Sequence, residues 1–218
     1  MEWNWTFAFA ILPHLLEGAK TTILATFLGF LIAIVLGLAM ALGRRSQQPW
    51  IARAVGLCAD FIRGTPLLVQ LYVLFFVLPN MGVVLSPLVA GVIGLGLHNA
   101  TYIAEVYRAG IESISRGQWE ASKACNLGIS QTWRHIIIPQ AIPPMIPALA
   151  NYLIAMFKET PLLSAITVYE IMGEALGAAS RTYRYLEPVT MVGVFFLIIS
   201  LVCAYFARVI EERVRIHQ

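Results

Sequence analysis

Three long stretches of the chain contain no charged residue, and this spacing constrains the fold more than any other feature. Thr21 to Gly43, Leu67 to Ala104 and Val189 to Ala207 contain no Asp, Glu, Lys or Arg. A helix needs roughly 20 mostly apolar residues to cross the hydrocarbon core of a bilayer, which is about 30 Å thick. Each stretch is long enough for at least one crossing, so the sequence predicts a helical membrane protein.

The composition agrees with this interpretation. Apolar residues make up 59% of the 218 positions and charged residues 12%, against about 45–50% and about 25% in soluble domains.

The stretch from Leu67 to Ala104 contains Pro79-Asn80-Met81-Gly82 and Ser86-Pro87, which favour turns and divide it between two helices. Ile136 to Phe157 is also uncharged but rich in proline, and neighbouring helices in a bundle can satisfy the backbone groups that proline frees, so this crossing is expected to begin irregularly. We expect an all-α fold, one domain over 1–218, with five crossings at about 20–43, 55–79, 87–110, 137–157 and 189–209.

The basic residues indicate the orientation, because Lys and Arg are enriched in short cytoplasmic loops. One side of the predicted bundle receives ten of them: Arg44, Arg45, Arg53, Arg108, Arg116, Lys123, Arg134, Arg208, Arg213 and Arg215. The other side receives four: Lys20, Lys158, Arg181 and Arg184. The N-terminus is therefore predicted to be periplasmic and the C-terminus cytoplasmic, with a cytoplasmic loop at about 111–135 and a periplasmic one at 158–188.

Several features indicate minor roles. Trp3, Trp5 and Phe7 are expected to form an interfacial anchor along the outer surface. The first apolar run is longer than a signal-peptide core, so no cleavage is expected. Cys58, Cys125 and Cys203 lack the spacing of a metal or redox site and are expected to be packing residues. The net charge of +3 is explained by the cytoplasmic loops, and nucleic acid is not an expected partner.

Known catalytic motifs are absent from the sequence. It has no glycine-rich phosphate loop, no His-Glu-x-x-His and no Gly-x-Ser-x-Gly. We therefore expect no catalytic residue, no metal site and no cofactor in this chain, and any hydrolysis of ATP must take place elsewhere.

The cytoplasmic loop contains a predicted short helix from Gln118 to Asn126. Trp119, Ser122 and Asn126 fall at helical spacing on one side, and small residues on another side would let a second protein approach closely. Asn126 suits a chain reversal, because Asn tolerates the left-handed conformation that ends many helices. Ser130 is a candidate N-cap of the turn that follows. The alternative is a polar connector with no binding role.

Two charge pairs lie near membrane boundaries, where charges usually mark a pathway or an ion pair. Asp60 and Arg63 are three residues apart, and Glu105 and Arg108 repeat that spacing, so each can pair across one helical turn. We expect structural salt bridges rather than substrate contacts. The sequence from Arg63 to Pro66 is expected to break or kink the second crossing.

Polar side chains within the crossings should face the interior of the bundle. Gln70, Tyr72, Asn99 and Tyr102 could bind the carboxylate and the cationic part of a zwitterionic solute. Glu159 precedes Pro161, which interrupts the fourth crossing, and broken helices often line transport cavities. These five residues are the predicted substrate pathway. Hydrogen bonds within the bundle, and a structural role for Lys158 and Glu159, are the alternatives.

The loop also resembles that of a known family. Glu120-Ala121-Ser122, followed by Ile136-Ile137-Ile138-Pro139-Gln140-Ala141, resembles the "EAA" loop of the permease subunits of ABC-type importers. In that family the loop forms a coupling helix that sits in a groove of the cytoplasmic ATPase. Here Ser122 replaces the second alanine and Asn126 the usual glycine. The resemblance implies ATPase-docking residues at Trp119, Glu120, Ala121, Ser122, Asn126 and Gly128.

Further segments resemble the polar amino-acid subgroup of these permeases, namely 61–70, 102–111 and 158–162. The runs 124–126 and 156–164 are most similar to ectoine and hydroxyectoine permeases. The resemblance implies a five-helix, type I importer permease of the inner membrane that works by alternating access. Its implied partners are an ATPase dimer that binds ATP and Mg, a second permease, a periplasmic solute-binding protein and the lipid bilayer. The alternatives are a passive channel or a signalling subunit without an ATPase and, less favoured, a membrane enzyme.

Overall fold

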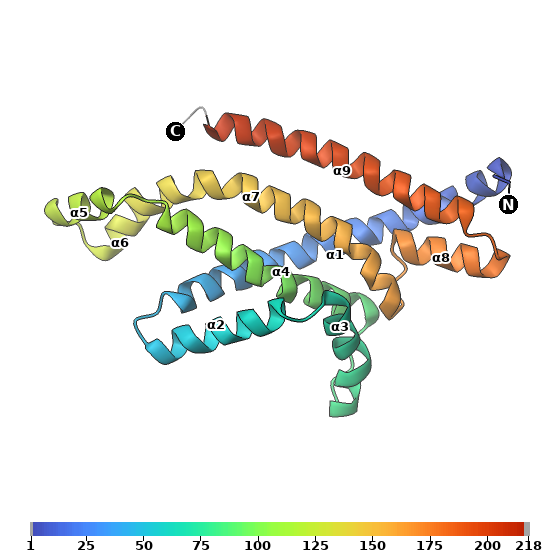
Figure 1. The fold of residues 1–218 in the computed structure, drawn as a ribbon, viewed down its shortest axis with the longest axis horizontal. Helices are drawn as coiled ribbons and strands as arrows, with labels where there is room; N and C mark the ends of the chain where they lie inside the picture. Colours follow the sequence, from blue (N-terminus) through green and yellow to red (C-terminus); the bar gives the residue numbers. More distant parts are fainter. Residues whose placement is uncertain (1, 216–218) are drawn as a thin grey trace.

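The computed structural model describes residues 2–215, which form long helices that run side by side (Figure 1). The N-terminus lies at the same end of the molecule as α8, whereas α5 and α6 form the opposite end (Figure 1). The helices are α1 (Trp5–Arg44), α2 (Pro49–Arg63), α3 (Leu67–Tyr72), α4 (Pro87–Glu112), α5 (Arg116–Ala124), α6 (Ile129–Thr132), α7 (Ile138–Glu159), α8 (Ile171–Thr182) and α9 (Leu186–Arg215). The described chain is therefore all-α, as predicted.

Four helical segments of the described residues are long and apolar enough to cross a membrane, and a bent pair can provide a fifth crossing. The first crossing, α1, starts earlier in the chain than predicted. α1 has 40 residues and begins at Trp5 rather than near Lys20, so it is about 60 Å long, twice the thickness of the hydrocarbon core. The expected anchor is wrong in one point: Trp5 and Phe7 do not form a separate surface segment, because they belong to the first turns of α1. Ile11 and Leu15 pack on α8 and α9, which explains the extra length.

The second crossing, expected at 55–79, is not one helix. α2 ends at Arg63, and the chain from Leu67 to Met81 runs at 99° to it. The predicted break is present, and its cause is local: Pro66 has no N–H group and disfavours helical geometry at Thr65. After α3 the chain continues as a π-helical turn, Val73–Val77, and a 3-10 turn, Leu78–Met81.

The third crossing is α4, which packs along α1 through small residues. A Cβ on Gly96 would lie 2.6 Å from Ile32, and one on Gly37 would lie 2.9 Å from Ile103. Small residues at such positions let two helices approach closely in a membrane, where van der Waals packing drives association. This contact fixes α4 in the centre of the bundle and buries Asn99.

The fourth crossing begins irregularly, as the prolines predict. A π-helical turn, Trp133–Ile137, joins α6 to α7, and Pro139 lies in the first turn of α7, where its missing N–H needs no partner. The expected N-cap at Ser130 is wrong. Gly128 occupies that position, and its backbone N–H donates to the Gln131 side chain at 3.0 Å.

The remaining segments complete the bundle. The loop predicted at 158–188 contains a 3-10 segment, Thr160–Ile166, and α8, and α9 forms the fifth crossing. The role expected for the cysteines is wrong for two of them, because Cys58 and Cys125 are exposed and only Cys203 is partly buried. No cluster of metal-ligating side chains occurs within the described residues.

Candidate functional site

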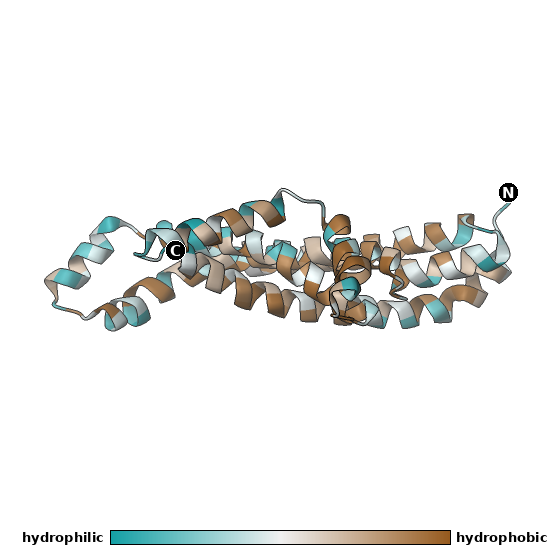
Figure 2. Cartoon of the chain, turned by 90° about the horizontal axis from the view of Figure 1, so that it is seen from below, coloured by the Kyte–Doolittle hydropathy of each residue, from teal (hydrophilic) through white to brown (hydrophobic). Residues whose placement is uncertain are grey.

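The short helix α5 lies beyond the apolar part of the bundle. Figure 2 shows hydrophilic residues in α5 and α6 at one end, whereas brown, hydrophobic residues dominate the middle. α5 joins α4 to α6 and is connected to each of them by a short turn. It therefore projects from the end of the bundle that the basic residues assign to the cytoplasm.

The two faces of α5 differ. The Trp119 ring packs edge-to-face on Trp133, with ring centroids 5.5 Å apart, and Ser122 is buried, with its hydroxyl donating to the Trp119 carbonyl. The family resemblance implies that both residues dock on the ATPase, and in the structure both pack against the chain itself. Glu120 and Ala121 are exposed, so the free surface of α5 is on their side.

Backbone hydrogen bonds close the turn after α5. Asn126 has a left-handed backbone with φ 55°, as predicted for a chain reversal. Its N–H donates to the Lys123 carbonyl, and the N–H of Leu127 donates to the Ser122 carbonyl at 3.0 Å, the pair of bonds that closes a Schellman motif. Gly128 follows as the N-cap of α6. The reversal holds α5 at a fixed angle to the rest of the loop.

Both predicted ion pairs are present, and Glu105 joins them. Arg63 bonds to Asp60 at 2.6 Å and Arg108 to Glu105 at 2.8 Å. Glu105 also accepts from Arg63 at 3.2 Å and pairs with Arg44. One carboxylate of α4 thus holds the end of α1 and the end of α2, an arrangement that the sequence analysis missed because Arg44 lies 61 residues away.

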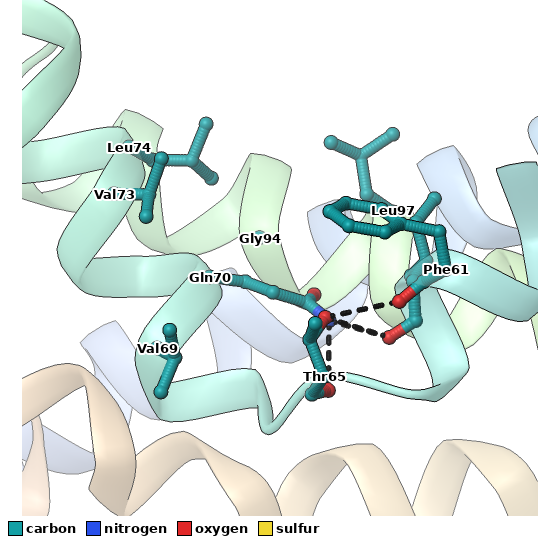
Figure 3. Close-up of a pocket in the computed structure, with 9 residues that line it drawn as sticks. Phe61, Thr65, Val69, Gln70, Val73, Leu74, Gly94 and Leu97 are labelled. Atoms are coloured by element: carbon teal, nitrogen blue, oxygen red, sulfur yellow. Dashed lines mark hydrogen bonds between the residues drawn. The ribbon is translucent and has the colours of Figure 1, made fainter.

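Gln70, a predicted pathway residue, makes structural hydrogen bonds. Its amide nitrogen donates to the Ile62 carbonyl at 2.7 Å and to the carbonyl and hydroxyl of Thr65 (Figure 3). These bonds bridge the break between α2 and α3. Beside them lies a mostly apolar pocket of about 240 Å³ that reaches Gly94 and Leu97 of α4 (Figure 3). Tyr72, the other predicted residue of α3, is exposed.

Three of the predicted pathway residues take part in two contacts between α4 and α7. The Asn99 amide donates to Glu159 at 2.8 Å and to the Leu95 carbonyl at 3.1 Å. Tyr102 lies three residues further along α4 and stacks on Tyr152, with centroids 6.0 Å apart. Tyr152 was missed, although it precedes Glu159 by two helical turns and so shares its face of α7. The cluster combines one carboxylate, one amide and two aromatic rings.

Glu170 is a buried acid that the sequence analysis did not identify. It is fully buried as the N-cap of α8. Its carboxylate accepts from the Gly173 N–H at 2.8 Å and from the Thr22 hydroxyl at 3.4 Å. Burial raises the pKa of this carboxyl group to about 7, although the hydrogen bonds oppose the shift. No helix was predicted over 171–182, so no sequence signal marked Glu170 as a cap.

These features define a class of protein. The described chain is a polytopic helical subunit with four or five crossings, one of them broken. A rigidly held short helix extends from one end, and a polar cluster lies inside. This is the architecture of a membrane subunit of a transporter.

Comparison with known proteins identifies the family. Residues 33–216 match the family described as "Binding-protein-dependent transport system inner membrane component". The chain is 42% identical, over 94% of its length and 89% of the relative's, to a probable amino-acid ABC transporter permease of Sinorhizobium fredii. It is 35% identical to the glutamine transport system permease GlnP of Escherichia coli, over 99% and 100% of the two chains. The chain belongs to this family of permeases.

Solved structures agree. A crystal structure of an amino acid ABC transporter with histidines superposes with a TM-score of 0.92 at 32% identity, covering 98% of this chain and 100% of the other. The methionine transporter MetNI shares the fold, with a TM-score of 0.72 at 20% identity, covering 97% and 99%. The predicted type I importer permease fold is confirmed. The chain is a multi-pass inner-membrane permease, and in this family the ATPase is a separate subunit.

Proposed function

We propose that this permease imports a polar amino acid or an ectoine-like compatible solute by alternating access. Its relatives include the glutamine permease above and, at 31% identity, the arginine transport system permease ArtQ of Bacillus subtilis. The ectoine alternative rests on the similarity of residues 124–126 and 156–164 alone. In either case the solute is small and zwitterionic, and a periplasmic binding protein delivers it.

The observation that carries the proposal is the exposed face of α5. Glu120 and Ala121 point away from the chain, and the reversal at Asn126 fixes the helix in place. A rigid helix at the cytoplasmic end can transmit the closing of two ATPase subunits to the crossings. Docking then involves Glu120, Ala121 and the turn at Asn126 and Gly128 directly, whereas Trp119 and Ser122 support the helix from within.

The cluster at Asn99 supports a solute pathway between α4 and α7. The Glu159 carboxylate and the rings of Tyr102 and Tyr152 are groups that attract an ammonium ion. The amide of Asn99 can donate to a carboxylate if the solute replaces Glu159 as its partner. We assign this cluster to the pathway. Gln70 is not assigned, because its amide nitrogen is used by the break between α2 and α3.

A second permease subunit, identical or homologous, would complete the pathway. Broken helices beside charged residues are typical of transport cavities at the interface of two repeats. The bend at Gly64 in the second crossing and the 3-10 segment after Glu159 are two such interruptions.

Docking can be tested in the purified complex. Glu120→Lys reverses a charge on the exposed face of α5, and we expect it to abolish solute-stimulated ATP hydrolysis and reduce co-purification of the ATPase. Ser130→Ala is a control on the same loop, because this exposed residue makes no cap. If Glu120→Lys and deletion of 118–126 both left uptake and co-purification unchanged, a channel without an ATPase would be the better interpretation.

The solute can be identified in proteoliposomes that contain the complex and its binding protein. We expect ATP-dependent uptake of labelled glutamine, arginine or ectoine, with one of them preferred by at least ten-fold. Uptake of none of these zwitterions would overturn the assignment of the solute class, while ATP-dependent uptake of another solute would leave the assignment as an importer intact.

A further inference from the structure

A groove of about 520 Å³ lies between the end of α1 and the segment that contains α5 and α6. Arg45 and Gln47 line it on the side of α1. Trp119, Lys123 and Trp133 line it on the side of α5 and α6. The groove lies on the inner side of α5, so it is distinct from the exposed face that carries Glu120.

The groove is positively charged. Arg45 and Lys123 both line it, and its lining within the described residues contains no Asp or Glu. The Arg45 guanidinium lies over the Trp133 ring, 5.7 Å from the centroid, which orients the cation without neutralising it. In the described part of the chain neither Arg45 nor Lys123 forms an ion pair with a carboxylate. Both charges remain available to an anion.

The groove is also apolar at its rim. Leu42 is 51% exposed and Ile129 is 81% exposed, and both belong to its lining. Leu42 lies in the last turn of the membrane-crossing α1, and Arg45 directly follows that helix. Arg45 therefore lies where the hydrocarbon is expected to end, near the depth of the phospholipid headgroups, and Lys123 of α5 lines the groove opposite it. A ligand that matches both the positive charge and the apolar residues of the groove carries an anionic group and an adjoining hydrocarbon chain.

We propose that this groove binds an acidic phospholipid of the cytoplasmic leaflet, with its phosphate held by Arg45 and Lys123 and its chain against Leu42 of α1. Basic pockets at the cytoplasmic side of membrane helices bind anionic headgroups for the same electrostatic reason. The bound lipid would connect the end of α1 to the inner side of α5. The coupling of the docking helix to the crossings then depends on the lipid composition of the bilayer.

Lipid retention by the intact complex tests the proposal. The complex of permease and ATPase would be reconstituted in nanodiscs of phosphatidylcholine with increasing phosphatidylglycerol, and retained lipid would be counted by native mass spectrometry. We expect selective retention of phosphatidylglycerol by the wild-type complex. Arg45→Gln and Lys123→Gln should each weaken it roughly five-fold, and the double variant roughly twenty-five-fold. Arg53→Gln, an exposed cation of α2 outside the groove, is the matched control and should bind like the wild type.

Four results would overturn the proposal. The first is equal retention by the double variant and the wild type. The second is an equal loss in Arg53→Gln, which would indicate an unspecific effect of surface charge. The third is displacement of the lipid by millimolar inorganic phosphate, because the site would then recognise a free anion. Co-purification of the ATPase is measured in the same samples. If the double variant lost the ATPase instead of the lipid, the groove would belong to the docking surface, which would also contradict the proposal.

Discussion

The Glu159 carboxylate at the end of α7 accepts a hydrogen bond of 2.8 Å from the Asn99 amide in α4. Asn99 is almost fully buried, and the two residues are 60 positions apart in sequence. Their bond connects two crossings inside the bundle. It allows the charge of Glu159 to be separated experimentally from its role as a hydrogen-bond acceptor.

Glu159→Gln should abolish most uptake without unfolding the permease. The glutamine carbonyl can still accept from Asn99, so we expect a melting temperature close to that of the wild type. The loss of the charge removes an attraction for the solute ammonium of about 1.5–3 kcal/mol, which corresponds to a roughly ten- to hundred-fold loss of uptake. Uptake in proteoliposomes and thermal unfolding provide the two measurements. Normal uptake combined with a lower melting temperature would favour a purely structural bond.

Glu105 is predicted to be a stabilising centre. Glu105→Gln leaves the cations of Arg44, Arg63 and Arg108 close together without their shared carboxylate. We expect a loss of about 2 kcal/mol in the free energy of unfolding. Glu112→Gln is the control, because its pair with Arg108 is half exposed, and surface pairs contribute about 0–1 kcal/mol. Denaturation of both variants in detergent measures the difference, and equal effects would contradict the prediction.

Asn126 can be replaced by the glycine that the family usually has at this position. Gly adopts φ 55° without strain, so Asn126→Gly should preserve transport and the position of α5. Asn126→Val places a β-branched side chain in the left-handed region, which costs about 1–2 kcal/mol. We expect this variant to lose solute-stimulated ATP hydrolysis while its crossings remain folded. Equal ATP hydrolysis by the two variants would show that the reversal is not required for coupling.

Gly18 marks the closest approach of α1 to the segment before α8. A Cβ there would lie 2.8 Å from the Glu170 carbonyl carbon, which belongs to the backbone and cannot rotate away. Gly18→Ala should therefore destabilise the protein by about 1–3 kcal/mol. Gly193→Ala in α9 is the matched control, because nothing lies within 4 Å of its added methyl group. Melting temperatures in detergent compare the two, and the prediction fails if both variants behave like the wild type.

Stability should depend on pH through Glu170. Burial raises the pKa of its carboxyl group from 4.5 to about 7 in the folded chain. Between these values the folded state holds the proton more tightly than the unfolded state does, so the free energy of unfolding falls as pH rises, by on the order of 3 kcal/mol in total. Glu170→Gln remains uncharged and should flatten this dependence. Melting curves between pH 4.5 and 8 measure it. A wild-type melting temperature that rises with pH over this range, or an unchanged slope in Glu170→Gln, would contradict the assignment.

Helix interiors and breaks were predictable because their causes are local. The charge-free stretches identified α4 and α9, and the sequence around Pro66 predicted the break after α2. The left-handed reversal at Asn126 also followed from the properties of one residue. The start of α1 was not predictable in this way, because its first turns are held by packing against residues more than 150 positions later.

In the candidate site, too, the residue types could be predicted from the sequence, whereas their contacts could not. Asn99, Tyr102 and Glu159 could be chosen from the sequence as polar groups inside crossings, but the contacts of Asn99 with Glu159 and of Tyr102 with Tyr152 could not. Neither the direction of the Gln70 amide nor the burial of Ser122 could be foreseen, because each depends on how a helix is rotated against its neighbours.

The sequence by itself determined the membrane environment, the order of the crossings and the family, and it predicts their orientation. Each of these follows from hydrophobicity, charge or short motifs along the chain. The tertiary structure decided that Glu105 unites two predicted ion pairs, that Trp119 faces inward and that Glu170 is buried. These outcomes depend on the relative rotation and depth of the helices, which packing between residues distant in sequence sets.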